Sequence, residues 1–170
     1  MDIDDPLETL LGSIRDCLNG GLYYAGLVVA LTVPDVCAAL ESEDGKTSNQ
    51  KYKDWYESYL GELYKTLTSD DCYSLRCSVV HQGKFGHPNN QYRRVLFTVP
   101  NSQKNVYHNN IVENALNIDA ICFCTDVMNA ARKWYDTKRT DPNVIKNLQN
   151  LVSYRPDGLH PYMVGIPLIA

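Results

Sequence analysis

Apolar residues recur every three or four positions along most of this chain, which is the spacing of one face of an α-helix. The first such stripe consists of Leu7, Leu10, Leu11, Ile14 and Leu18. It begins after Pro6, which a first helical turn tolerates, and ends before Gly20-Gly21, which suit a helix end. The pattern predicts a helix over about residues 6–18.

The next segment, residues 22–40, is apolar on nearly all sides, which indicates a helix buried against several neighbours. Pro34 is expected to kink it. Its longest apolar stretch, residues 22–33, is too short to cross a bilayer, so we expect no membrane span.

Four further helices are expected, two from the same periodicity and two from residues that cap a helix start. Their predicted ranges are residues 50–67, 69–82 (ending at Gly83), 115–137, and 142–152 after an Asp141 cap. Between the predicted helices 69–82 and 115–137 the pattern changes. Residues 92–99 form a β-type run, and residues 105–112 are expected to return as its partner strand. The tail, residues 155–170, is rich in Pro and Gly and is expected to form an ordered but irregular strap or a short strand. We therefore predict one mainly α domain over residues 1–170, with a β-hairpin inserted at about residues 92–112.

The distribution of charge and the cysteine content indicate the kind of ligand and the cellular compartment. The net charge is −4, yet residues 72–112 contain five Lys or Arg and no acid, so this segment is +5 and the remainder −9. Such asymmetry favours a confined anionic ligand over a long wrapped polymer. The first ten residues are acidic, unlike a secretory signal, and the six cysteines are then expected to be free thiols in a cytoplasmic protein.

The predicted fourth helix carries the most informative motif, Leu75-Arg76-Cys77-Ser78-Val79-Val80-His81-Gln82-Gly83, in which Arg76 and His81 are separated by four residues. Together with the apolar Tyr-Tyr-Ala-Gly-Leu helix and the aromatic helix before it, this R-x4-H spacing resembles the HEPN superfamily. The resemblance covers about residues 5–85 and the long helix at 116–137. It implies a helical homodimer in which the motif helices of two chains meet; many family members cleave RNA without a metal.

The residue types suit that chemistry. Attack by the 2′-OH of RNA needs a base and an acid, and His serves as either near neutral pH. Arg holds the charge of the phosphorane bidentately. On a helix the two positions lie about 140° apart and roughly 7.5 Å apart in rise, flanking a face near Tyr73, Cys77 and Val80. One chain offers one motif His, so a symmetric dimer would supply both acid and base.

Other residues are assigned supporting roles. Asp35 lies in the apolar second helix and is expected either to pair with Arg76 or to be partly exposed after Pro34. Lys84, Arg93 and Arg94 are expected to contact RNA phosphates. The family often has a polar residue after the motif Arg, where this chain has Cys77, which bears on activity more than on fold.

From these residues we expect a metal-independent endoribonuclease for single-stranded RNA, similar to bacterial toxin or anti-phage enzymes. An antitoxin or regulatory protein is a possible partner. The alternatives are a non-catalytic HEPN-like module that binds a nucleotide or protein, a purely structural helical dimer, and a motif that serves only helix stability through the helix dipole and a salt bridge. A zinc site of Cys72, Cys77, His81 and His87 has no recognised spacing. No cofactor is expected.

Overall fold

The computed structural model describes residues 5–85, 92–103 and 105–170. It is mainly α-helical, as predicted, and its helices are α1 (Pro6–Asn19), α2 (Tyr23–Glu41), α3 (Asn49–Tyr59), α4 (Ser69–Gln82), α5 (Ala120–Lys138) and α6 (Pro142–Leu148). The strands are β1 (Arg94–Thr98), β2 (Asn110–Val112), β3 (Ala115–Asp119), β4 (Tyr154–Arg155), β5 (Gly158–Leu159), β6 (Met163–Val164) and β7 (Leu168–Ile169).

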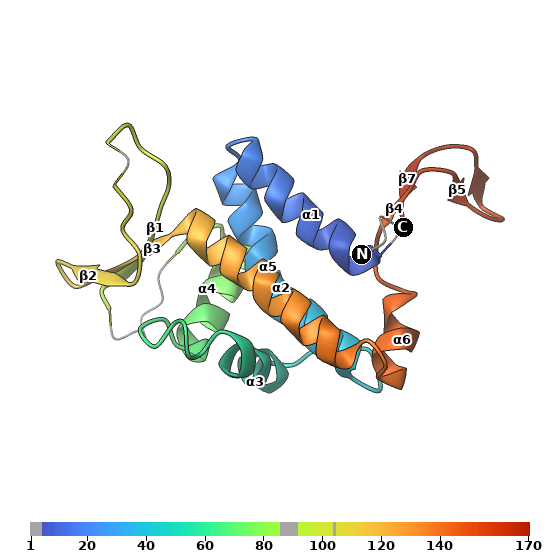
Figure 1. The fold of residues 1–170 in the computed structure, drawn as a ribbon, viewed down its shortest axis with the longest axis horizontal. Helices are drawn as coiled ribbons and strands as arrows, with labels where there is room; N and C mark the ends of the chain where they lie inside the picture. Colours follow the sequence, from blue (N-terminus) through green and yellow to red (C-terminus); the bar gives the residue numbers. More distant parts are fainter. Residues whose placement is uncertain (1–4, 86–91, 104) are drawn as a thin grey trace.

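Helix α2 is the centre of the core and lies behind the orange α5 in Figure 1. It contacts α1, α3, α4, α5 and α6, and Leu31, Val33 and Cys37 are fully buried on it. Its length and composition would allow it to cross a membrane. The packing of five helices around it accounts for the same apolar character, as expected for a core helix.

Polar contacts fix the helices that surround α2. Arg132 of α5 donates two hydrogen bonds to Glu8 of α1, of 2.9 and 3.1 Å. The indole N–H of Trp134 donates to Glu41 at the end of α2, at 3.1 Å. These pairs hold the long α5 across both N-terminal helices.

The β insertion between α4 and α5 is confirmed, but its predicted pairing is wrong. Strand β1 does not pair with residues 105–112; it pairs in parallel with β3, and β2 pairs antiparallel with β3, in the order β1-β3-β2. The hairpin is therefore β2–β3, and its turn is formed by Glu113 and Asn114, both with positive φ.

This sheet also corrects the predicted long helix. Residues 115–119 are a strand and α5 begins only at Ala120, because Asp119 caps it by accepting a hydrogen bond from the Cys122 amide at 2.9 Å. Two other predicted helices are too long: α3 ends at Tyr59 and α6 at Leu148. Residues 60–67 instead fold as turns that bury Leu60, Tyr64 and Leu67.

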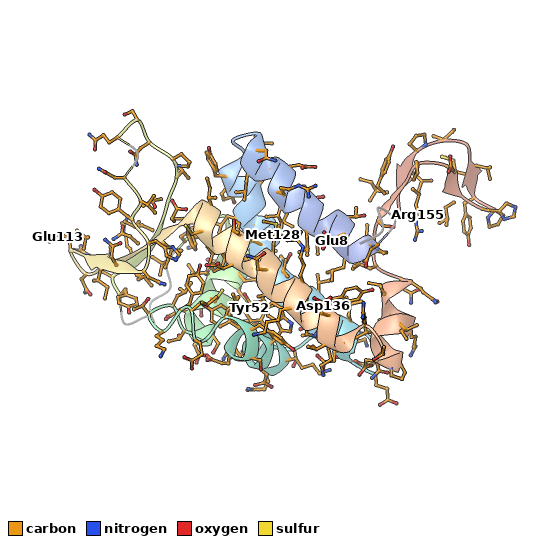
Figure 2. The ribbon with its side chains drawn as sticks, viewed as in Figure 1. Glu8, Tyr52, Glu113, Met128, Asp136 and Arg155 are labelled. Atoms are coloured by element: carbon orange, nitrogen blue, oxygen red, sulfur yellow. The ribbon has the colours of Figure 1, made fainter. Side chains whose placement is uncertain are left out.

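The C-terminal residues 152–170, hereafter the C-terminal arm, form two nested strand pairs, β4–β7 and β5–β6. The arm and the β1-β3-β2 sheet lie at opposite ends of the long axis of the molecule (Figure 1). Figure 2 shows this separation through Glu113, in the sheet turn, and Arg155, in the arm.

Candidate functional site

Helix α4 carries the motif residues, and both of its ends are defined by the sequence. Thr68 and Asp71 form a capping box, in which the Thr68 side chain accepts from the Asp71 amide and the Asp71 carboxylate accepts from the Thr68 amide. Gly83 ends the helix with φ of +64°, a left-handed conformation that glycine adopts readily. The helix begins at Ser69, as predicted, and its N-cap is Thr68.

Arg76 points from α4 toward α2, where it meets Asp35. Its Nε lies 2.6 Å from Oδ2 of Asp35, and the two side chains are 22% and 10% exposed. Neither of these two atoms makes a well-aligned hydrogen bond, so the contact is a close ion pair. Of the two alternatives for Asp35, the structure contains the pairing with Arg76.

Burial acts against both charges in this pair. It raises the pKa of the Asp35 carboxyl, and this effect outweighs the opposing influence of the Arg76 charge and a hydrogen bond from Thr47. Burial also opposes the charge on Arg76, but Asp35 and Cys77 outweigh it and raise the pKa of Arg76 above its ordinary value. The guanidinium therefore stays charged, and its position is determined by a buried partner.

Tyr73 and Cys77, one turn apart on α4, complete the surroundings of Arg76. The Cys77 Sγ lies 3.8 Å from Nη1 of Arg76 and interacts with the Tyr73 hydroxyl. The Tyr73 ring packs edge-on against the Tyr52 ring, with 5.3 Å between the two centroids. The Lys53 ammonium lies 5.8 Å from the centroid of the Tyr73 ring. The structure thus brings Asp35, Tyr73, Arg76 and Cys77 into one cluster.

His81 is exposed at the C-terminal end of α4, between the exposed Val80 and Gln82. No hydrogen bond links it to Arg76 within the described part of the chain. This separation follows from the spacing of five residues, since Arg76 faces α2 while His81 faces solvent. A single chain therefore presents the Arg and the His on different sides of one helix.

The three predicted phosphate contacts are also exposed. Lys84 follows α4 directly, Arg94 is the first residue of β1, and Arg93 donates its backbone N–H to Asn114 at 2.9 Å. His87, the fourth residue of the zinc hypothesis, lies outside the described residues. His108 instead has a structural role, because its Nδ1 accepts the Asp119 amide at 3.3 Å and its ring packs on Tyr64.

The cysteines of the described chain are free thiols, and no group of three metal-ligating side chains occurs among the described residues. Cys72 is fully buried beside the Tyr52 hydroxyl, at 3.3 Å, and burial raises its pKa to about 12. A thiol in that state is a core side chain and a poor metal ligand.

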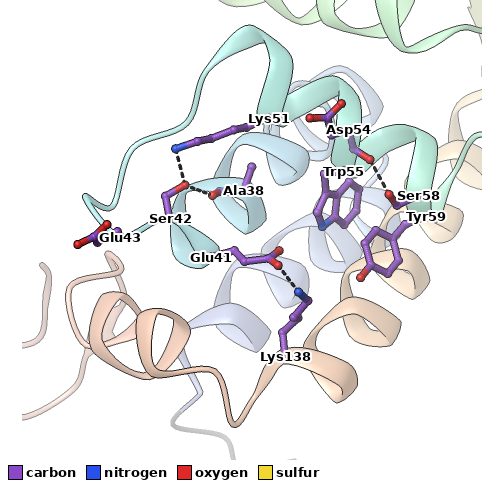
Figure 3. A pocket seen from close by; sticks show the side chains of 10 residues that line it. All are labelled: Ala38, Glu41, Ser42, Glu43, Lys51, Asp54, Trp55, Ser58, Tyr59 and Lys138. Atoms are coloured by element: carbon purple, nitrogen blue, oxygen red, sulfur yellow. Dashed lines mark hydrogen bonds and ion pairs between the residues drawn. The ribbon is translucent and has the colours of Figure 1, made fainter.

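A separate cavity of about 500 Å³ lies between the end of α2, α3 and the end of α5 (Figure 3). Its two lysines are already engaged: Lys138 pairs with Glu41, and the Lys51 ammonium donates to the Ser42 hydroxyl at 2.8 Å. Because these charges are satisfied inside the chain, the cavity is a weaker site for RNA phosphate than the exposed Lys84, Arg93 and Arg94.

Sequence reasoning missed Thr47, whose side chain reaches Asp35 from the loop between α2 and α3. A polar residue in a polar loop gives no periodic signal, so the contact emerges only from the tertiary structure. Comparison of this chain with protein-family models, with curated proteins and with solved structures gave no match.

Proposed function

We propose that this protein is a HEPN-like, metal-independent ribonuclease for single-stranded RNA, with Arg76 as the phosphate clamp and His81 as the acid or base. The observation that carries the proposal is the ion pair between Asp35 and Arg76, 2.6 Å apart. A cation on the motif helix whose position is fixed by a buried carboxylate is preorganised for a charged transition state.

A second copy of the chain would complete the site. When two α4 helices meet about a two-fold axis, two exposed His81 side chains and two Arg76 side chains approach one scissile phosphate. One His81 removes the proton of the 2′-OH as its oxygen bonds to phosphorus, and the other protonates the departing 5′-oxygen. The apolar surface of α2 is not available for this contact, because the helices of the same chain already cover it.

The test is incubation of the purified chain with mixed single-stranded RNA, with and without EDTA. His81→Ala is expected to lower the rate roughly 10²–10⁴-fold, the usual range for a positioned acid or base. Arg76→Ala is expected to cost a comparable amount, at least about 10²-fold. His160→Ala and Arg15→Ala, which change exposed residues elsewhere, are the matched controls and should retain the wild-type rate.

The products should carry a 2′,3′-cyclic phosphate and a 5′-hydroxyl, because the nucleophile is the 2′-OH of the RNA. DNA, which lacks this hydroxyl, should remain intact. Loss of activity on chelation with recovery on adding zinc or manganese would contradict the proposal, as would cleavage of DNA at a similar rate.

One observation favours a second candidate, a non-catalytic nucleotide- or protein-binding module. Catalytic histidines are normally oriented by a hydrogen-bond partner, and none is found for His81 within residues 5–85, 92–103 and 105–170. Wild-type protein that is dimeric and folded yet inert on every RNA would support this candidate. A bacterial toxin or anti-phage effector role belongs with the first candidate only.

A further inference from the structure

The C-terminal arm exposes an unusual amount of apolar surface. Within residues 152–170, all of which the structure describes, Ser153 alone is buried. The exposed apolar side chains are Val152, Tyr154, Leu159, Tyr162, Met163, Val164, Ile166 and Ile169. Tyr162 is 84% exposed. Eight exposed apolar side chains within these residues indicate a surface that another molecule covers.

The shape of the arm is nevertheless specified by its sequence. Gly158 has φ of +85°, and a Cβ at this position would lie 2.1 Å from the Met163 carbonyl oxygen, so only glycine fits. Ser153 and Ala170 exchange two backbone hydrogen bonds, of 2.8 and 3.1 Å, which close the base of the arm. Strand pairs this short are only marginally stable by themselves. The arm thus has defined turns but no core of its own.

A cavity of about 410 Å³ lies at the base of the arm. Its lining residues are Pro6, Tyr135, Arg139, Val144, Ile145 and Leu148 of the helical body, with Gln149 and Arg155. Arg139 and Arg155 are the charged residues among them, and neither makes an ion pair within the described residues. The Arg155 Nε is buried without a hydrogen-bond partner there. Asp5, whose carboxylate caps α1, reaches the neighbouring Tyr135 hydroxyl.

We propose that the arm docks onto this cavity of a second copy of the chain, and that the second copy's arm does the same in return. The charges are complementary: Asp157 is the arm's carboxylate, is exposed and has no ion pair in the described chain, while the cavity offers two arginines. A partner carboxylate at the cavity would neutralise the positive charge of these arginines.

The size of the surface also fits a second copy. The arm together with the seven other cavity residues falls within the roughly 20–30 residues per partner of a stable interface. Because the arm and the cavity are adjacent on one chain, a two-fold axis between two copies lets each arm reach the other copy's cavity. The exchange buries apolar side chains that a single chain leaves in water.

This contact is independent of the proposed function, because the arm and α4 lie in different halves of the molecule (Figure 1). If α4 also pairs, two different two-fold contacts per chain close as a tetramer, and loss of the arm contact leaves a dimer of half that mass. If α4 does not pair, wild-type protein is a dimer and loss of the arm contact gives a monomer. Arm pairing is thus measurable whichever result the RNA assay gives.

The experiment is light scattering of the full chain at tens of micromolar. Tyr162→Asp should halve the mass, and because Tyr162 is so exposed the change should leave the helical body folded by circular dichroism. Ile111→Asp is the matched control, since Ile111 is an apolar residue of β2 that is also exposed, to 53%, and its variant should keep the wild-type mass. Equal masses for wild type and Tyr162→Asp would overturn the proposal.

Charge reversal tests whether the arm of one copy occupies the cavity of the other. Asp157→Arg should weaken self-association at least about tenfold, and adding Arg139→Asp to it should restore most of the loss, as expected for a paired contact. No weakening, or weakening without recovery in the double variant, would contradict docking of the arm on the cavity of a second copy.

Discussion

The carboxylate of Asp35 on α2 lies 2.6 Å from the guanidinium of Arg76 on α4, in a place where Asp35 is only 7% exposed. The pair joins the core helix to the helix that carries the candidate chemistry. Because burial of one charge is tolerated only with a partner, each residue determines where the other lies. A substitution at Asp35 should therefore change the position of the Arg76 side chain more than it changes the rest of α4.

The pKa of Asp35 predicts how pH affects stability. Burial raises this pKa above 3.8, so the folded protein holds the proton more tightly than the unfolded chain does. The stability contributed by Asp35 is then fully present below pH 3.8 and is lost as pH rises through the raised pKa. Asp35→Asn lacks this titration. The difference in unfolding free energy, wild type minus Asp35→Asn, should fall as pH rises, as measured by urea denaturation from about pH 3 to 6.

A difference that grows with pH over this range would mean that attraction to Arg76 outweighs burial. Asp136→Asn is the matched control, because Asp136 is exposed and without an ion pair in the described residues. Its difference from wild type should stay nearly constant over the same pH range.

The helices were the predictable part of this fold, because their signals are local. Thr68, Asp71 and Gly83 delimit α4 through contacts with near neighbours. The 3–4 spacing of apolar residues locates α1 correctly, and the nearly continuous apolar segment locates α2. The ion pair could also be anticipated, since a carboxylate in an apolar helix requires a partner and Arg76 was a candidate.

The sheet could not be predicted from local signals in the sequence. Leu116 and Ile118 are two residues apart, which fits a strand, but the apolar run continues directly into α5 and masks the change of period. The pairing of β1 with β3 joins residues about twenty positions apart, and the intervening sequence does not encode it. The exposed arm was equally hidden, because apolar residues near Pro and Gly look the same whether a core covers them or not.

The capping box predicts a measurable contribution to stability. Thr68→Ala removes the side chain that accepts the Asp71 amide at 3.2 Å, leaving an unpaired donor at the start of α4. The cost should be about 1 kcal/mol in the free energy of unfolding, as for other N-cap residues. Urea denaturation of Thr68→Ala beside Thr140→Ala, an exposed threonine after α5, gives the comparison. Equal midpoints would show that the cap contributes nothing.

The exposed arginines of the β1 segment should affect substrate binding more than chemistry. The double change Arg93→Ala with Arg94→Ala removes the proposed contacts to RNA phosphates, which would be equally strong in the ground and transition states. We expect KM to rise and the salt dependence to flatten, with kcat little changed. The control is Arg15→Ala with Lys133→Ala, two exposed cations elsewhere. A collapse of kcat at constant KM would place the arginines beside the reacting phosphate.

We expect a substitution at Gly158 of the arm to abolish assembly without unfolding the helical body. In Gly158→Ala the new methyl group would meet the Met163 carbonyl, and φ of +85° is unfavourable for alanine, so the arm should lose its shape. The apolar core lies in the helices and the β1-β3-β2 sheet, so the helical circular dichroism signal should persist while light scattering reports half the mass. Gly12→Ala, inside α1 where a Cβ meets only the end of the Arg15 side chain at 3.4 Å, should keep both properties. Gly158→Ala with an unchanged mass would show that assembly does not depend on the arm.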